Sequence, residues 1–303
     1  MTQTDVPHPH ARLHTHLPVA SATTVAVPRS LGSERLALAV AVITLAAFAV
    51  AEVITVYTDP LTGIALHATT LSALLIGAGF GGQDEGTTEQ RIARLLHTLA
   101  LVPLIRIVSL TMPLGRFDET YWFLAAGLPV FAAALVIMAG LGLRPRDVGL
   151  HIGRSALHLH PLVILFGLFL GLTEYHILHP EPLIEELTLR QFVAPALILI
   201  VATGFLEEFI FRGILQRTAT AALGPLAILY VSLIFAILHI GYRSGTDLLF
   251  VFIIALLYGW VVRRTGSIIG VSVSHGVTNI ALFLLVPFIP TLSAQPEWLP
   301  PLW

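Results

Sequence analysis

The chain has 303 residues, of which 56% are hydrophobic and only 11% are charged, and its mean hydropathy is +0.86. A soluble domain of this length carries many more charges, so the composition predicts a protein that lies in a lipid bilayer. Cysteine and lysine are both absent, which excludes disulfides, thiol nucleophiles, cysteine-ligated metal sites and any catalytic lysine. The formal net charge of -2 and the lack of a broad basic surface predict no nucleic-acid partner.

The N-terminal residues 1–31 are rich in His, Pro, Thr and Ser and show no helical apolar period, which predicts a flexible tail. Four of its histidines, His8, His10, His14 and His16, are close enough in sequence to bind a metal ion. Their spacing is undemanding, and we favour a solvated tail.

Nine apolar segments follow, and they are divided by Gly, Pro and charged residues. Open sheets cannot span lipid because their edges would be unsatisfied, so the segments are expected to be helices. We predict an all-α, polytopic transmembrane bundle of about eight or nine helices. The first segment is too long and starts too late for a cleaved signal peptide. The segments are 36–57, 61–80, 92–112, 120–143, 158–178, 193–217, 223–240, 248–262 and 267–289.

After the tail we predict three regions: N-terminal membrane helices over 32–192, a motif-bearing membrane core over 193–289, whose motifs are expected to be catalytic for the reasons that follow, and a short C-terminal tail over 290–303. The arginines predict a multi-pass protein of the cell membrane with its N-terminus in the cytoplasm, because eleven then flank inner ends and three flank outer ends. The eleven are Arg12, Arg29, Arg35, Arg91, Arg94, Arg144, Arg146, Arg154, Arg217, Arg263 and Arg264, and the three are Arg116, Arg190 and Arg243.

The sixth segment places charges inside an apolar run, ATGFLEEFIFRGILQR, where each costs on the order of 2.5–3.5 kcal/mol on insertion scales. Glu208 and Arg212 are four residues apart on one helix face, which predicts a buried ion pair. Glu207 points about 100° away and has no local cation. We therefore expect Glu208 to be held by an ion pair and Glu207 to be free to take part in a reaction.

The later segments add two spaced pairs of polar and aromatic residues. FAILHIG places Phe235 four residues before His239, and SHGVTNI places His275 and Asn279 four apart on one face. Each pair alone is more typical of helix packing than of a catalytic site. The functional interpretation depends on all three patterns occurring together and in this order.

Together, EExxxR, FxxxH and HxxxN on successive apolar segments resemble the CAAX protease and bacteriocin-processing family (CPBP or Abi), which includes the Ras-converting endopeptidase. The resemblance covers about 193–289, and none of the three patterns is broken. The matching residues are Glu207, Glu208 and Arg212, then Phe235 and His239, then His275 and Asn279.

The resemblance implies peptide-bond hydrolysis in a membrane cavity, with Glu207 deprotonating a water that His239 helps to hold. His275 and Asn279 would donate hydrogen bonds to the oxyanion, and Glu208 with Arg212 would hold the site's geometry. A desolvated carboxylate suits a general base near neutral pH, and paired donors suit a tetrahedral oxyanion. The implied partners are peptide or lipid-anchored protein substrates within membrane lipid, either membrane-associated or cleaved at a C-terminal, CAAX-like sequence.

Other intramembrane protease classes fit less well, because the sequence has no HExxH, no paired GxGD aspartates and no rhomboid GxSG. Among the remaining acids, Glu52 is expected to pair with Arg106, and Glu174 near His176 to line a cavity, each in a structural role.

The proposed base and its helper differ in predicted depth. Glu207 falls toward the cytoplasmic end of its segment, whereas His239 falls near the outer end of the next, at ~1.5 Å per residue. A broken or tilted sixth helix, or a deep water-filled cavity, would bring them together.

Two functions from other classes remain open. A catalytically silent scaffold or immunity protein would use the polar cluster to hold helices together, and a proton-coupled transporter would use it as a relay. A transporter is expected to have two symmetry-related halves, whereas the polar residues of this chain gather in the last segments. The transporter therefore ranks below the scaffold. Because the basic residues are all arginine, as in GC-rich bacteria, leader peptides or membrane-tethered proteins are as probable as prenylated substrates.

Zinc is the alternative to a metal-free mechanism. Glu207, His239 and His275 could form a two-histidine, one-carboxylate set with water as fourth ligand. No short HxxxH or HExxH spacing pre-organises two of these ligands, and the resemblance favours a glutamate mechanism. We expect no cofactor.

Overall fold

A computed structural model describes residues 31–81, 86–113, 115, 118–153 and 156–290. Within this part of the chain there are helices and no strands, and eight helical stretches are long and apolar enough to cross a membrane. The predicted all-α, polytopic bundle is therefore confirmed. The tail histidines His8, His10, His14 and His16 lie outside the described residues.

The observed helices follow the predicted segments with shifted ends. The first helix begins at Leu31 instead of Leu36, and the short predicted segment 248–262 is a full helix over Gly245–Thr265. The α-helices are α1 (Leu31–Tyr57), α2 (Pro60–Gly79), α3 (Thr88–Leu99), α4 (Leu101–Thr111), α5 (Glu119–Gly140), α6 (Ala156–Leu178), α7 (Leu189–Ile198), α8 (Leu206–Glu208), α9 (Gln216–Leu223), α10 (Ala227–Ile237), α11 (Gly245–Thr265) and α12 (Ile269–Ile280).

Side-chain caps fix the starts of four of these helices. Asp59 accepts a hydrogen bond from the backbone N–H of the third residue beyond it, and Thr87, Thr188 and Ser244 do the same for α3, α7 and α11. Such caps satisfy amide groups that have no partner within the helix. The polar residues between the apolar segments therefore decide where each span begins.

The helix that carries the glutamates is one long rod from Leu189 to Leu223, made of α7, a π-helical stretch, α8, a second π-helical stretch and α9. Gly224 ends it with a φ of 62°, a conformation that favours glycine, and a 3-10 turn leads into α10. The span Leu189–Tyr242 therefore contains both the sixth and the seventh predicted segments, and nine predicted segments correspond to eight spans.

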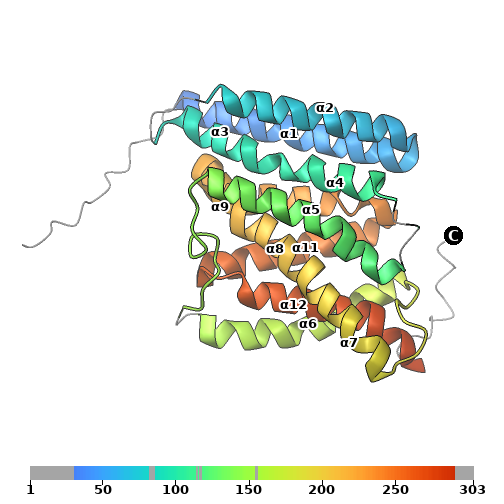
Figure 1. Ribbon diagram of the computed structural model, residues 1–303. Helices are drawn as coiled ribbons and strands as arrows, with labels where there is room; N and C mark the ends of the chain where they lie inside the picture. The colour runs from blue at the N-terminus through green and yellow to red at the C-terminus, as the bar shows by residue number, and fades with distance from the viewer. Residues whose placement is uncertain (1–30, 82–85, 114, 116–117, 154–155, 291–303) are drawn as a thin grey trace, which may run out of the picture.

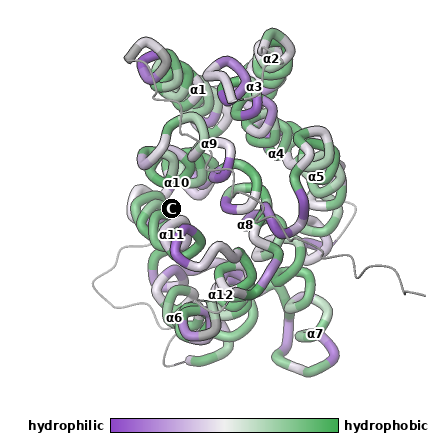
Figure 2. The backbone as a smooth tube through the Cα atoms, turned by 90° about the vertical axis from the view of Figure 1, so that its left-hand side faces the viewer, coloured by the Kyte–Doolittle hydropathy of each residue, from purple (hydrophilic) through white to green (hydrophobic). Residues whose placement is uncertain are grey.

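The rod of α7, α8 and α9 runs obliquely across the bundle in Figure 1. Helices α1, α2 and α3 form one outer group, while α6 lies at the opposite side against α12 (Figures 1 and 2). The first π-helical stretch packs on α12 and α5, and α10 packs on α11. The middle of the rod is thus surrounded, which places Glu208 and Arg212 inside the protein.

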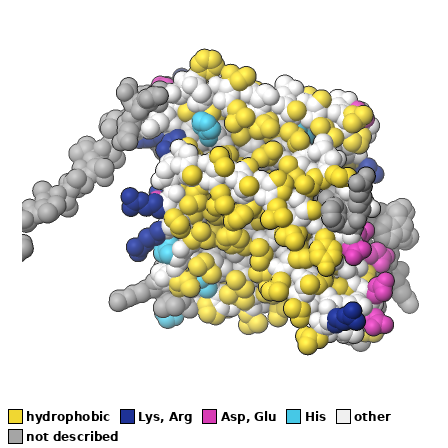
Figure 3. All heavy atoms as spheres, in the orientation of Figure 1, with side chains coloured by type: hydrophobic (Ala, Val, Ile, Leu, Met, Phe, Trp, Pro, Cys, Tyr) yellow, Lys and Arg dark blue, Asp and Glu magenta, His cyan; other side chains and the backbone are white. Residues whose placement is uncertain are grey.

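Charges gather at the two ends of the bundle. Figure 3 shows arginine side chains along its left edge, most of the visible acidic side chains together with further arginines at its right edge, and a hydrophobic band between them. Such a band matches the surface that lipid tails require, and an arginine-rich end is typical of a protein with a fixed orientation in the membrane.

Helix α12 approaches the rod very closely at a pair of glycines. A Cβ atom added to Gly204 would lie 2.5 Å from the backbone nitrogen of Gly276 and 2.6 Å from the carbonyl oxygen of Ser272. Small residues allow this approach between membrane helices, where van der Waals packing drives association. The contact fixes the position of α12 relative to the glutamates.

We expect Gly204→Ala to lower the free energy of unfolding by roughly 1–3 kcal/mol, because the methyl group would push the two backbones apart. Gly79→Ala is the matched control, since nothing lies within 4 Å of a Cβ added there. Thermal unfolding of both variants in detergent measures the difference. Equal stability of the two variants would show that the close approach is not needed.

Candidate active site

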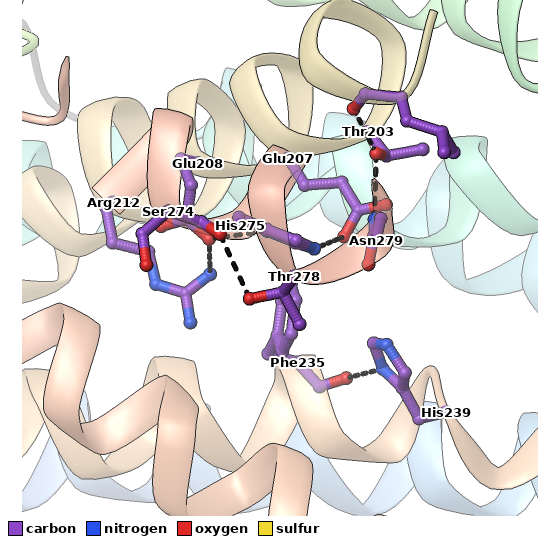
Figure 4. A network of polar contacts seen from close by, with 11 residues as sticks. Thr203, Glu207, Glu208, Arg212, Phe235, His239, Ser274, His275, Thr278 and Asn279 are labelled. Carbon is purple, nitrogen blue, oxygen red and sulfur yellow. Dashed lines mark hydrogen bonds and ion pairs between the residues drawn. The ribbon is translucent and has the colours of Figure 1, made fainter. Parts of the chain in front are cut away.

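All seven residues of the three motifs line a single cavity with an empty volume of about 670 Å³. The rod contributes the glutamates and the arginine, α10 and the turn after it contribute Phe235 and His239, and α12 contributes His275 and Asn279. Figure 4 shows these side chains converging from the three elements. Five further residues with polar side chains line the cavity, namely Glu174, Thr203, Tyr242, Tyr258 and Thr278.

The two glutamates sit in the short α8, between π-helical stretches over Leu199–Phe205 and Phe209–Leu215. π-Helical turns are rare and occur frequently at functional sites, because each one changes the direction of the side chains that follow it. Here they bracket Glu207 and Glu208 on both sides. No pattern in the sequence predicted these two π-helical stretches.

Glu208 is fully buried and holds two partners. Its Oε1 accepts hydrogen bonds from Arg212 Nη1 at 2.9 Å and from His275 Nδ1 at 3.0 Å. The predicted ion pair between Glu208 and Arg212 is present. The contact with His275 comes from another helix and was not predicted.

Glu207 has the opposite surroundings. Its side chain is 34% exposed, makes no hydrogen bond within the described residues, and faces His275 Nε2 at 3.9 Å. A single imidazole therefore lies between the two acids, with Nδ1 toward Glu208 and Nε2 toward Glu207. The predicted contrast between a braced and an unbraced carboxylate is found in the structure.

His239 is oriented by its own helix. Its Nδ1 lies 2.8 Å from the carbonyl oxygen of Phe235, and a carbonyl only accepts, so Nδ1 carries the proton. In the neutral ring, Nε2 is then an acceptor. The Phe235 ring lies 4.9 Å from His239 and 4.3 Å from the Arg212 guanidinium, so it separates that cation from the histidine.

The predicted difference in depth does not separate Glu207 from His239. Both line the cavity just described, and both also line a neighbouring groove between α5, the rod and α10. The oblique course of the rod accounts for this, and it is one of the arrangements that the sequence analysis allowed.

Asn279 is held by a residue that the sequence analysis missed. Its Nδ2 donates to Thr203 Oγ1 at 2.8 Å, and Thr203 Oγ1 in turn donates to the carbonyl oxygen of Leu199. One amide hydrogen of Asn279 is used in this way, and the other is left for a ligand. Thr203 lies four residues before Glu207, which was the only signal that could have found it.

Two other acidic groups were predicted outside the motifs. Glu174 lines the cavity as expected, while His176 donates Nδ1 to its own helix at Leu172. Glu52 pairs with Arg106 as expected, with 2.5 Å between Oε1 and Nε. His67, which was not predicted, adds a third member, as described below.

No group of three or more His, Asp or Glu side chains within the described residues is arranged to hold a metal ion. Glu207, His239 and His275 therefore line one cavity without forming a metal-ligand cluster. The histidines of the N-terminal tail lie outside the described residues.

Comparison with family models gives a match for the part of the chain that carries the motifs. Residues 189–281 match the family model described as Type II CAAX prenyl endopeptidase Rce1-like. The matched range contains every residue of the three motifs. No curated protein and no solved structure matches the chain.

Proposed function

We propose that this protein is an intramembrane endopeptidase in which Glu207 activates water, because residues 189–281 match the model of the Rce1-like type II CAAX prenyl endopeptidases. The observation that carries the proposal is the contrast between two adjacent glutamates. Glu208 is buried and doubly bonded, whereas Glu207 is open to the cavity and free of hydrogen bonds within the described residues. A carboxylate that makes no hydrogen bond inside a membrane is costly, and a functional role explains it.

In the proposed reaction, water binds between Glu207 and the acceptor nitrogen of His239, and Glu207 removes a proton from it. The resulting hydroxide forms a bond to the carbonyl carbon of the substrate, whose carbonyl oxygen becomes an oxyanion. A carboxylate oxygen can accept a proton from a bound water, which is the role proposed for Glu207.

His275 and Asn279 are proposed to stabilise the oxyanion. In this scheme His275 is an imidazolium, with Nδ1 toward Glu208 and the proton on Nε2 donated to the oxyanion. Asn279 supplies the amide hydrogen that Thr203 does not use. When the carbon–nitrogen bond breaks, the proton held by Glu207 passes to the leaving amine, which restores the carboxylate.

Glu208 and Arg212 are proposed to position the catalytic groups without touching the substrate. The pair fixes His275 through Nδ1, and Arg212 lies over the Phe235 ring that also contacts His239. Both histidines are therefore held through one buried arginine.

The proposed substrates are peptides or proteins attached to the membrane, because the cavity lies within the spanning helices. We further propose that the arginine-rich end faces the cytoplasm, with the N-terminus on that side, as the positive-inside rule predicts. The bundle then presents the acidic loop between α6 and α7 to the outside.

The test is cleavage of a random peptide pool by purified protein in detergent, with new termini identified by mass spectrometry. A defined set of cleaved bonds is expected with the wild-type protein and none with the protein boiled beforehand. A folded protein that cleaves nothing, in detergent and in vesicles, would instead support a scaffold that uses the polar cluster to join helices.

The glutamate mechanism predicts that activity survives removal of metal. Purified protein should contain less than one metal ion per chain, and exhaustive dialysis against a chelator should leave the rate unchanged. Elemental analysis and the peptide assay measure the two. If stoichiometric zinc were found, and if its removal stopped cleavage and its return restored it, Glu207, His239 and His275 would be ligands instead.

A further inference from the structure

A second buried charge cluster lies outside the motifs, where α1, α2 and α4 meet. Glu52 Oε1 lies 2.5 Å from Arg106 Nε and 3.2 Å from His67 Nε2. The side chains of Glu52 and His67 are 0% exposed, while that of Arg106 is 16% exposed. The arginine is therefore the one member of the cluster that reaches an open space.

That space is the groove between α5, the rod and α10, with an empty volume of about 1170 Å³. Arg106 lines it together with Glu207 and His239, and its other walls are mostly apolar side chains such as Ile105, Val130, Leu206, Ile210 and Leu238. The groove thus leads from the catalytic carboxylate to one arginine through apolar surroundings.

The guanidinium of Arg106 has N–H donors beyond the one that binds Glu52. Only Nε is bonded to Glu52, and neither Nη group meets an acceptor within the described residues. The two Nη groups form the end of the planar fork that binds a carboxylate with two parallel hydrogen bonds. Glu52 holds the fork in place through Nε.

We propose that Arg106 binds the free C-terminal carboxylate of the peptide whose scissile bond lies at Glu207. The inference rests on the proposed endopeptidase function and assigns the residue that holds the chain end of its substrate. One cation in a groove whose walls are mostly apolar suits a chain end that has apolar side chains and a single negative charge. A carboxylate so bound sets how far into the groove the peptide extends.

Binding tests this without cleavage. Glu207→Gln protein is immobilised in detergent and incubated with random hexapeptides made in two forms, with a C-terminal carboxylate or carboxamide. Mass spectrometry counts the retained peptides. The carboxylate form is expected to be enriched by about 10- to 100-fold, as for hydrogen bonds between charged groups. Adding Glu52→Gln and Arg106→Gln together, which removes both charges, should abolish the enrichment.

Two further variants control for folding and for charge. Arg106→Lys keeps the charge but lacks the fork, so the enrichment should fall without disappearing. Arg243→Gln should leave the enrichment intact, because Arg243 bonds the carbonyl oxygen of Val56 and does not line the groove.

Three results would overturn the proposal: equal retention of both peptide forms, an enrichment that persists in the doubly neutral variant, or an enrichment of Asp- and Glu-containing peptides whatever their C-terminus. The binding experiment does not measure hydrolysis, so the cleavage assay tests the proposed function separately.

Discussion

Glu207→Gln is expected to abolish proteolysis while leaving the protein folded and inserted. The amide keeps the size and the hydrogen-bonding capacity of the side chain but cannot take a proton from water. Loss of a general base costs roughly 10²–10⁴-fold in rate. The rate of cleavage of a peptide identified in the random pool measures the loss.

Glu186→Gln is the matched control, because Glu186 is an exposed carboxylate in the loop before α7. It should cleave at the wild-type rate. Both variants should melt at the wild-type temperature. Full-speed cleavage by a folded Glu207→Gln protein would remove Glu207 from the role of base.

Glu208→Gln and Arg212→Gln are expected to destabilise the fold itself. Either change leaves an uncompensated charge in a fully buried site, which costs on the order of 3–5 kcal/mol of unfolding free energy. Replacing both residues together should cost less than the sum of the two single changes, because no unpaired charge remains. Thermal unfolding of the two single variants and the double variant in detergent gives the coupling.

The exposed pair of Arg217 and Asp147, 3.5 Å apart, supplies the comparison. Exposed pairs contribute little to stability, so its single and double variants should melt close to the wild type with no measurable coupling. Strictly additive shifts at Glu208 and Arg212 would mean that the buried pair does not act as a unit.

The membrane spans were predictable because about 20 apolar residues are needed to cross ~30 Å of hydrocarbon, and this length leaves a strong signal in the sequence. The end of the rod at Leu223 was not predictable in this way. Helix α9 continues past Arg217 to Leu223, although its sequence is polar, because Thr218 is buried against Thr98 of α3 with 2.7 Å between hydroxyls. Hydropathy cannot register a contact between segments that are 120 residues apart.

The candidate site also combines contacts that were predictable from the sequence with contacts that were not. Spacing within one helix predicted the pair of Glu208 and Arg212, because residues four apart share a face. The contacts of His275 with Glu208 and of Asn279 with Thr203 join separate helices, and they depend on where α12 crosses the rod. That crossing is set by packing at Gly204 and Gly276, which no periodicity reveals.

The imidazole between the two acids has a consequence for variants of the two glutamates. His275 contacts Glu208 through Nδ1 and Glu207 through Nε2, so a change of one acid alters the ring that the other acid faces. Residues that share a partner in this way do not have additive effects. In free-energy terms, the loss of rate in the double variant would therefore differ from the sum of the two single losses, although Glu208 never meets the substrate.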